Sequence, residues 1–558
     1  MRYAIGIDLG GTNVKMTSVS EQGEVLEELT FATRDEPGGD WAARVREAVH
    51  ALEGRRGSRA SWIGIANPGL PSADGQSVAS LSGRLEGLVG LVWSDLFGTK
   101  ATVRCLNDAQ AALVGEAWKG AAVGHRYAVL LTLGTGVGGA ILSQGRLVGG
   151  TLGRAGHMGH LCLDPEGPPP DTTPVPGALE TMIATSTLAR RSGGRFTDTK
   201  ELVAAHLAGD AHATEVWMRS VHRLACGISS ILNTVDPEIV VLGGGIARAG
   251  AALFEPLARF MDSVEWRPYG RAVPVVPAKL GSMAGALGAA RAAMLAGPAG
   301  QYLDKARDLV SSVEAQTDAI SRAADWFAET ILAGRMVHVF GSGHSRILVE
   351  EMWPRYGSFP GFNPIVELSL TFHNLVVGAN GQRQAMFLEN TAGLAERILR
   401  NFDLKPADSA LVISSGGGSV VSIEMAEGFR RRGIKVVAIV SGAHAAATPS
   451  RHPAGLRLTD CADLVLDTGA PVGDAMVRVP GLDTPVSPGS TVGGCLLVNA
   501  IKAEVAARLT VAGQPPTVLT AGALVGSERS EALFESAYDE HARRLARLYQ
   551  DLGREEGK

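Results

Sequence analysis

The stretch YAIGIDLGGTNVKMTSVS, residues 3–20, decides the fold class of the first half of the chain. It has the pattern of an apolar strand, a glycine turn and a second strand. A second stretch of the same form, LLTLGTGVGGAILSQ, follows at residues 130–144. This internal echo predicts two related halves, each built on a strand, a glycine-rich turn and a returning strand, around a common cleft.

Further short apolar strands end in glycine or small residues, with helical stretches between several of them. They are SWIGIANPG, EIVVLGGG, MVHVFGSGHS, SALVISSGGGS, IKVVAIVS and ADLVLDTG. This alternation predicts an α/β architecture throughout. The small, unpatterned segment LAGPAGQ at residues 295–301 indicates a domain boundary. We therefore expect one domain over residues 1–295, a linker and lead-in helix over 296–320, and a second domain over 321–545.

Composition excludes several classes of protein. The 558 residues carry a net charge of −5, so no basic excess favours nucleic acid or an anionic membrane as a partner. The five cysteines form no CxxC pair, which argues against a disulfide framework and a cysteine-rich zinc module. The first residues lack the charged and apolar regions of a signal peptide. We expect a soluble cytoplasmic protein.

The two glycine turns of the first half suit phosphate binding. Gly10 and Gly11 allow positive φ angles and a close approach of backbone N–H groups to an anion. Around this turn, Asp8 can hold Mg²⁺ through water, Thr12 offers a hydroxyl and Lys15 a charge. The second turn, Gly134-Thr135-Gly136, would complete a clamp for a triphosphate.

Asp108 allows two interpretations. In LNDAQAALVGEAW it stands where a helix N-cap is expected. Because the same chain carries two phosphate turns, it can also be the carboxylate that takes a proton from a sugar hydroxyl as that hydroxyl attacks the γ-phosphate.

The motifs of residues 1–295 resemble those of the ROK family of sugar kinases. In order they are DLGGT, NPG, ND, LGTGVGG, GHMGH, VVLGGGIA and AGALGAA. The resemblance implies an actin-like (ribonuclease H-like), two-lobed ATPase fold that uses ATP and Mg²⁺ to phosphorylate a hexose or aminohexose. It implies Asp108 as the general base, with Asn67 and Asn107 facing the sugar. It also implies ATP-binding positions at Gly134, Thr135, Gly136, Gly243, Gly244 and Gly245.

The loop after GHMGH departs from this family pattern. The family has E-x-G-H and then three cysteines, which hold a structural zinc ion together with the histidine. Here His157 replaces the glutamate, His160 matches the zinc histidine, and the cysteine positions are Asp171, Thr173 and Ala178. These residues cannot complete a tetrahedral site, so we expect no structural zinc. We expect instead a sugar-facing loop, stiffened by prolines, in which His157, His160 and Glu180 contact the sugar; His157 can alternatively simply pack.

The second half repeats a strand, a serine- and glycine-rich turn and a helix start. Such turns suit a phosphate monoester because hydroxyls and free N–H groups meet there. With FGSGHS, NPIVELSL, VISSGGGS, DTGAPVGDA and NAIKAEV, residues 320–525 resemble a SIS (sugar isomerase) domain, which implies a doubly wound αβα sandwich. The predicted phosphosugar-binding residues are Ser342, Ser345, Ser414, Ser415 and Ser419; the position of the second motif serine is taken by Gly416.

An isomerase of this kind needs a base that moves a proton between two sugar carbons. Glu351 is the predicted base; Glu350, Glu504 and His444 are weaker candidates. The leading hypothesis is a bifunctional enzyme, a sugar kinase followed by isomerisation or related conversion of the phosphosugar. The alternative is a kinase with a non-catalytic SIS domain that senses phosphosugar. SIS sheets commonly pair, so we also expect a homo-oligomer.

Overall fold

The computed structural model describes residues 2–35, 40–81, 85–169, 173–371 and 381–549, except the side chains of 381 and 382. The chain forms two compact units, Met1–Gly297 and Pro298–Lys558. Within the described ranges, none of the helices has the length and apolar character needed to span a membrane.

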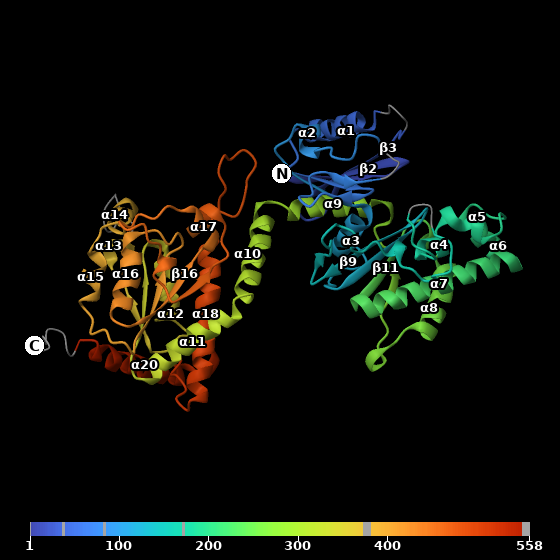
Figure 1. The fold of residues 1–558 in the computed structure, drawn as a ribbon. Helices are drawn as coiled ribbons and strands as arrows, with labels where there is room; N and C mark the ends of the chain where they lie inside the picture. The colour runs from blue at the N-terminus through green and yellow to red at the C-terminus, as the bar shows by residue number, and fades with distance from the viewer. Residues whose placement is uncertain (1, 36–39, 82–84, 170–172, 372–380, 550–558) are drawn as a thin grey trace, which may run out of the picture. The chain divides into compact units, whose positions relative to one another are not determined.

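The first unit contains both strands and helices (Figure 1). Its strands are β1 (Tyr3–Leu9), β2 (Asn13–Ser20), β3 (Val25–Ala32), β4 (Trp62–Asn67), β5 (Leu70–Pro71), β6 (Val78–Ser80), β7 (Thr102–Asn107), β8 (Ala128–Leu133), β9 (Val137–Ser143), β10 (Arg146–Leu147), β11 (Ile239–Gly243) and β12 (Val275–Pro277). Its α-helices are α1 (Trp41–Arg56), α2 (Trp93–Phe97), α3 (Asp108–Lys119), α4 (Leu179–Ile183), α5 (Leu188–Arg191), α6 (Thr199–Leu207), α7 (Ala211–Val235), α8 (Ala251–Val264) and α9 (Ala284–Leu295).

The two large sheets of this unit have the same topology. Their strand orders are β3-β2-β1-β4-β7 and β10-β9-β8-β11-β12. In each, the first strand pairs antiparallel with the second and parallel with a later strand. The echo between residues 3–20 and 130–144 therefore corresponds to β1–β2 and β8–β9. This duplication confirms the predicted actin-like, two-lobed fold.

Helices α3 and α9 pack together, α9 on β1 and β4 and α3 on β8 and β9. Glycines make this contact possible. A Cβ atom added to Gly6 would lie 1.9 Å from the carbonyl oxygen of Ala286, and one added to Gly64 would lie 1.8 Å from that of Ala289. Gly288 of α9 meets the carbonyl oxygen of Ala111 in the same way, at 1.7 Å. The backbone of α9 thus lies directly on the first sheet and on α3.

Replacement of Gly64 by alanine is expected to destabilise the protein by about 2–3 kcal/mol, because the new methyl group can be placed only by moving α9. The matched control is Gly54→Ala. Gly54 is an exposed residue of α1 with no atom near the added Cβ, so this change should stabilise the protein by about 0.5–1 kcal/mol. Urea unfolding of both variants measures the difference; equal effects would contradict the packing described for α9.

The second unit contains α10 (Pro298–Glu314), α11 (Thr317–Leu332), β13 (Val337–Gly341), α12 (Arg346–Met352), β14 (Phe362–Ile365), α13 (Leu368–Thr371), α14 (Gly381–Leu388), α15 (Leu394–Leu399), β15 (Ser409–Ile413), α16 (Val420–Arg431), β16 (Lys435–Val440), α17 (Gly442–Ala447), β17 (Leu464–Asp467), α18 (Ser490–Val511), α19 (Gly522–Val525) and α20 (Ser527–Arg547). The five strands described in this unit are all parallel, in the order β14-β13-β15-β16-β17. The direction of the strand order therefore reverses between β13 and β15.

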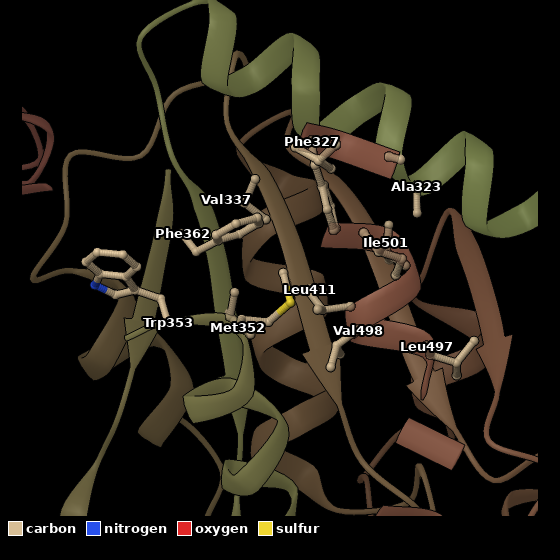
Figure 2. Packing of buried hydrophobic residues seen from close by; sticks show 14 of the residues in the cluster. Ala323, Phe327, Val337, Met352, Trp353, Phe362, Leu411, Leu497, Val498 and Ile501 are labelled. Atoms are coloured by element: carbon tan, nitrogen blue, oxygen red, sulfur yellow. The ribbon is translucent and has the colours of Figure 1, made fainter. Parts of the chain in front are cut away.

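Alternate strand residues face opposite sides of this sheet, as the two-residue period of a strand requires. Val337, Leu411 and their neighbours on one face pack against α11, α12 and α18, and Figure 2 shows Phe327, Met352 and Val498 converging there. Phe340, Val412 and their neighbours on the other face pack against α15 and α16. With helices on both faces, the sheet is the predicted doubly wound αβα sandwich.

Candidate functional site

Polar side chains stand at the carboxyl ends of three neighbouring strands in the first unit. Asp8 lies near the end of β1, Asn67 ends β4, and Asn107 ends β7 directly before Asp108. Strand pairing places Asn67 beside Asn107, and Asp8 beside the residue before Asn67. The structure therefore brings together the predicted metal residue Asp8, the predicted sugar residues Asn67 and Asn107, and the predicted base Asp108.

Asp108 begins α3, but it is not the residue that caps the helix. Asn107 is the N-cap: its Oδ1 accepts a hydrogen bond from the backbone N–H of Ala109. Asn107 also donates to the carbonyl oxygen of Gly69. Since Asn107 already caps the helix, the capping role that was the alternative for Asp108 is not needed. Asp108 is exposed to solvent, yet the surrounding protein raises the pKa of its carboxyl by desolvation, against a lowering hydrogen bond from Ala109.

Asp8 is a second carboxylate with a perturbed pKa. Burial raises the pKa of Asp8 to about 6, although the Lys15 ammonium, 3.7 Å from its Oδ2, acts in the opposite direction. The nearby charge of Asp108 raises it further. Two carboxylates that repel each other in a partly desolvated site are a suitable place for a cation.

The turn between β1 and β2 differs from the prediction in one respect. Neither Gly10 nor Gly11 has a positive φ angle. Gly10 is needed for space instead, because a Cβ atom there would lie 2.9 Å from the carbonyl oxygen of Asn13, to which the Gly10 N–H donates. Thr12, at the tip of this turn, is exposed.

The two remaining glycine turns lie side by side at the ends of β8 and β11. Gly243 pairs with Thr132 across these strands, and Gly244, with a φ of +87°, packs against the backbone of Leu133. The turn from Gly134 to Gly136 is closed by a backbone hydrogen bond, and Gly245 precedes a short 3₁₀ helix. These turns can present backbone N–H groups to one anion.

Glu180 holds the first of these turns in place. Its Oε2 accepts a hydrogen bond from the backbone N–H of Val137 at 2.9 Å, and a Cβ atom on Gly136 would lie 2.6 Å from the same oxygen. Glu180 is buried. The contact of Glu180 with a sugar stays a prediction. The structure shows in addition that Glu180 fixes the turn through its hydrogen bond with Val137.

His157 lies close enough to Asp108 for the two charges to affect each other's pKa. Burial lowers the pKa of His157, so the imidazole is neutral at pH 7. Its Nε2 is buried and has no hydrogen-bond partner in the described part of the chain. His160 stacks on His157, with 6.3 Å between ring centroids, and its Nδ1 lies 3.4 Å from Oγ1 of Thr173.

The loop that follows is closed by backbone pairing. Leu163 donates to the carbonyl of Gly177, Leu179 donates to that of Leu161, and Cys162 pairs with Ala178. Asp171, one of the replaced cysteine positions, lies outside the described residues. Among the residues described, no three histidine, cysteine or carboxylate side chains are grouped as a metal site would require.

Raised pKa values have a consequence for stability. A carboxyl whose folded pKa lies above its unfolded pKa costs stability once it is ionised, so the contribution of Asp8 falls as the pH rises from about 4 to about 6. Asp8→Asn removes this cost, so the melting temperature of the variant minus that of the wild type should increase as the pH rises from about 4 to about 6.

The matched control for Asp8 has the opposite sign. Hydrogen bonds from Ser72 and the backbone of Gln76 lower the pKa of the exposed Asp74, so most of the stability that Asp74→Asn loses relative to the wild type is already lost at about pH 4, and its melting-temperature difference should stay nearly constant from there to pH 7. Thermal unfolding of the full chain between pH 4 and pH 7 tests both. A melting-temperature difference for Asp8→Asn that does not change with pH would contradict the burial of an ionised Asp8.

The second unit contains a cavity of about 350 Å³ at the carboxyl ends of β13 and β15. This is where the strand order reverses, the usual place for a ligand in such sheets. All five predicted phosphosugar residues line it: Ser342, Ser345, Ser414, Ser415 and Ser419. The Oγ atom of Ser415 is buried without a hydrogen-bond partner among the described residues, so it can donate to a ligand.

Glu389 is a carboxylate in this cavity that the sequence reasoning missed. It follows the end of α14, and its Oε2 accepts a hydrogen bond from Ser342 at 3.0 Å. Burial raises the pKa of Glu389, while Ser342 and the charge of Arg451 lower it. The surrounding sequence FLENTAG forms no recognisable motif. Glu389 meets Ser342, 47 positions earlier in the chain, only in the folded structure.

His444 also lines the cavity, and its tautomer can be assigned. Its Nδ1 accepts a hydrogen bond from the backbone N–H of Gly473 at 3.1 Å, so in the neutral ring the proton is on Nε2. A Cβ atom on Gly416 would lie 3.6 Å from that Nε2. Glycine at this motif position therefore leaves room between His444 and the serine-rich turn.

Glu351 does not line the cavity. Its Oε1 accepts from Asn499 at 2.8 Å, and its other oxygen is paired with Arg355. Partial burial disfavours its charge, but these two hydrogen bonds lower the pKa of Glu351 overall. A carboxylate with a low pKa, held by an arginine away from the serine turns, is a poor base, so the structure argues against the predicted catalytic role of Glu351. Glu350 and Glu504 pair with Arg346 and Arg508 in the same way.

Comparison with known proteins follows the division into two units. The ROK family model matches residues 4–295. A glucokinase of Thermotoga maritima is 33% identical over 306 residues, which cover 51% of this chain and 95% of that protein. A glucokinase of Halalkalibacterium halodurans is 30% identical over 315 residues, 51% of this chain and 93% of that protein. A solved ROK hexokinase from Thermus thermophilus is 31% identical, covering 52% of this chain and 98% of its own, with a TM-score of 0.46.

The SIS domain model matches residues 301–441. A UPF0309 protein of Streptomyces coelicolor is 32% identical over 244 residues, which cover 44% of this chain and 96% of that protein. The match covers nearly the whole length of that relative, so the second half of the chain corresponds to a protein that exists as a separate chain.

Proposed function

Because the chain belongs to the ROK family over residues 4–295 and carries a SIS domain over residues 301–441, we propose that it is an ATP-dependent sugar kinase whose second unit converts the phosphosugar product. The kinase assignment rests on the cluster of polar residues at the ends of β1, β4 and β7. In this cluster Asn107 caps α3, which leaves the carboxylate of Asp108 available as a base. The glucokinase relatives support a hexose as the substrate, and an aminohexose stays the alternative that the family resemblance implies.

In the proposed reaction, the oxygen of the sugar hydroxyl attacks the γ-phosphate of ATP while Asp108 takes the hydroxyl proton, and ADP leaves. The raised pKa of Asp108 suits a base, because a weakly hydrated carboxylate holds a proton better. Asn67 and Asn107 orient the sugar; the Oδ1 atom of Asn67 is buried with no partner among the described residues. Backbone N–H groups of the turns at Gly134–Gly136 and Gly243–Gly245 hold the phosphates.

The residues around Asp8 fit a magnesium ion. Asp8 is a partly buried carboxylate next to a second carboxylate, and oxygen ligands of this kind are what Mg²⁺ prefers. Bound there, the ion would neutralise charge on the phosphates. Lys15, 3.7 Å from Asp8, adds a further positive charge on the same side of the turn.

His157 is proposed to select the sugar. A buried Nε2 without a partner is a place where a ligand hydroxyl gains a hydrogen bond. His157→Leu keeps the apolar packing and should lower kcat/KM for the preferred sugar about tenfold to a hundredfold, because one buried hydrogen bond is lost. Steady-state kinetics over a panel of hexoses and N-acetylhexosamines measures this. Unchanged kcat/KM in the variant would show that His157 only packs.

The second activity is proposed on the cavity of the second unit. The five serines hold the phosphate of the sugar. Glu389 removes a proton from C2 of the open-chain aldose, and the electron pair forms a C1–C2 double bond while charge develops on O1. The hydroxyl proton passes from O2 to O1, and Glu389 returns its proton to C1 as the C2 carbonyl of the ketose forms. His444, with its proton on Nε2, donates a hydrogen bond to the sugar oxygen on which charge develops. The step is an isomerisation and needs no further reactant.

The kinase assignment is tested by ADP release. The full-length protein with Mg-ATP should form ADP only when a hexose or N-acetylhexosamine is present. No sugar-dependent ADP over the whole panel would contradict it.

Pairing of two SIS sheets into a homodimer is part of the same proposal, and the mass in solution by light scattering tests it.

A further inference from the structure

A second cavity in the first unit is lined by arginines. It has a volume of about 250 Å³ and lies between the loop after Leu163, α4, α5 and α7. Its lining includes Arg190, Arg191, Arg219 and Arg223, with Asp164 as the acidic residue. None of Asp8, Asn67, Asn107, Asp108 or His157 lines it, so it is separate from the candidate kinase site.

Arg191 is set into the wall of this cavity. Its two terminal nitrogens donate to Oγ of Ser220 at 2.5 Å and to the carbonyl of Ala184 at 2.6 Å. Its Nε is buried and has no hydrogen-bond partner in the described part of the chain. Burial and the neighbouring Arg190 lower the pKa of Arg191 to about 10, so it stays charged at pH 7, while its terminal nitrogens donate to a hydroxyl and a carbonyl and not to a carboxylate. Arg191 as a whole is half-buried, and a partly desolvated cation is stabilised when an anion binds beside it.

The arginines on α7 add to the excess of positive charge. Arg219 and Arg223 are four residues apart and therefore lie on one face of the helix, where two like charges repel. Arg219 pairs with Glu215, but Arg223, half-buried, makes no ion pair or hydrogen bond with any residue that the structure describes. Arg190, from α5, uses one nitrogen for the carbonyl of Pro169. The wall thus offers several N–H donors to one anion.

We propose that this cavity binds the phosphate group of a small molecule, with Arg191 and Arg223 as its main donors. Guanidinium groups match phosphate because their N–H donors form paired, charge-assisted hydrogen bonds with its oxygens. The volume is below the roughly 300–1,000 Å³ of sites that enclose a whole drug-sized ligand, and suits inorganic phosphate or the phosphate end of a phosphosugar. Thr181 and Met182 of α4, directly after Glu180, form part of the wall.

The test is protection of individual arginines in the full-length protein. Phenylglyoxal modifies exposed arginines, and peptide mass spectrometry gives the rate at each position. Inorganic phosphate should slow modification of Arg223 and Arg190 about tenfold relative to sodium chloride of equal ionic strength, as expected for charge-assisted hydrogen bonds. Arg259, exposed on α8 outside the cavity, should react equally in both. Equal rates at Arg223 with and without phosphate would overturn the proposal.

Two further arms sharpen the result. Glucose 6-phosphate in place of inorganic phosphate distinguishes the sources: protection at a lower concentration identifies a phosphosugar, and protection only by inorganic phosphate identifies the free ion. Arg223→Gln removes a side chain without protein partners in the described structure, so folding should be kept while protection of Arg190 weakens about tenfold. Undiminished protection of Arg190 in this variant would contradict the assigned role of Arg223; Arg259→Gln is the matched control.

Discussion

Replacement of Asp108 by asparagine is expected to lower kinase turnover about 10²–10⁴-fold, because the variant keeps the shape of the side chain but cannot accept the proton of the sugar hydroxyl. The fold should not suffer, since Asn107 caps α3 and an asparagine oxygen can still accept the hydrogen bond that Asp108 accepts from Ala109. ADP release at saturating sugar and ATP measures the loss.

Two controls distinguish catalysis from folding in the Asp108 variant. Asp74→Asn changes an exposed aspartate of the same unit and should leave turnover unchanged. Phosphosugar binding by the second unit, measured by calorimetry on the full-length Asp108→Asn protein, should equal that of the wild type. Turnover within tenfold of the wild type would exclude Asp108 as the base.

Replacement of Glu389 by glutamine is expected to stop conversion of the phosphosugar, by about 10²–10⁴-fold, while ATP consumption continues at the normal rate. The glutamine oxygen can still accept the hydrogen bond from Ser342, so binding should be kept and the first phosphosugar should accumulate. Product analysis by ¹³C NMR after a fixed time measures this accumulation.

Glu351 supplies the matched control for Glu389. Its carboxylate is bound by Asn499 and Arg355 outside the cavity, and Glu351→Gln should convert phosphosugar at the normal rate. Loss of conversion in Glu351→Gln with full conversion in Glu389→Gln would reverse the assignment. If the wild type binds phosphosugar tightly and converts none, the second unit is a sensor, the alternative function.

Much of the fold could be predicted from the sequence because its signals are local. A strand that runs into a glycine turn, as at residues 3–20 and 130–144, carries both its secondary structure and its ligand-binding chemistry in one short segment. The duplicated sheets follow from those two segments. Asp108 could be proposed as a base because it stands between two phosphate turns in the chain, whereas the sugar-facing roles of Asn67 and Asn107 came from the resemblance of NPG and ND to ROK motifs.

The remaining features depend on contacts between distant segments. The spacing that placed Glu351 on the helix after the first serine turn was correct, but its orientation toward Asn499, 148 positions away, was not visible in the sequence. Glu389 reaches the cavity only through the folding of α14, and the arginine cavity draws on four separate segments. Gly10 is explained by a backbone approach and not by the φ angle that its place in a turn suggested.

The central claim is that one chain phosphorylates a sugar and then converts the product. The most direct measurement follows ³¹P and ¹³C NMR signals of full-length protein with Mg-ATP and a panel of ¹³C-labelled hexoses and N-acetylhexosamines. The account predicts that one sugar gives a phosphosugar whose signals rise and then fall as a second phosphorylated species appears. A phosphosugar that persists as the sole end product, or no phosphosugar from any member of the panel, would contradict it.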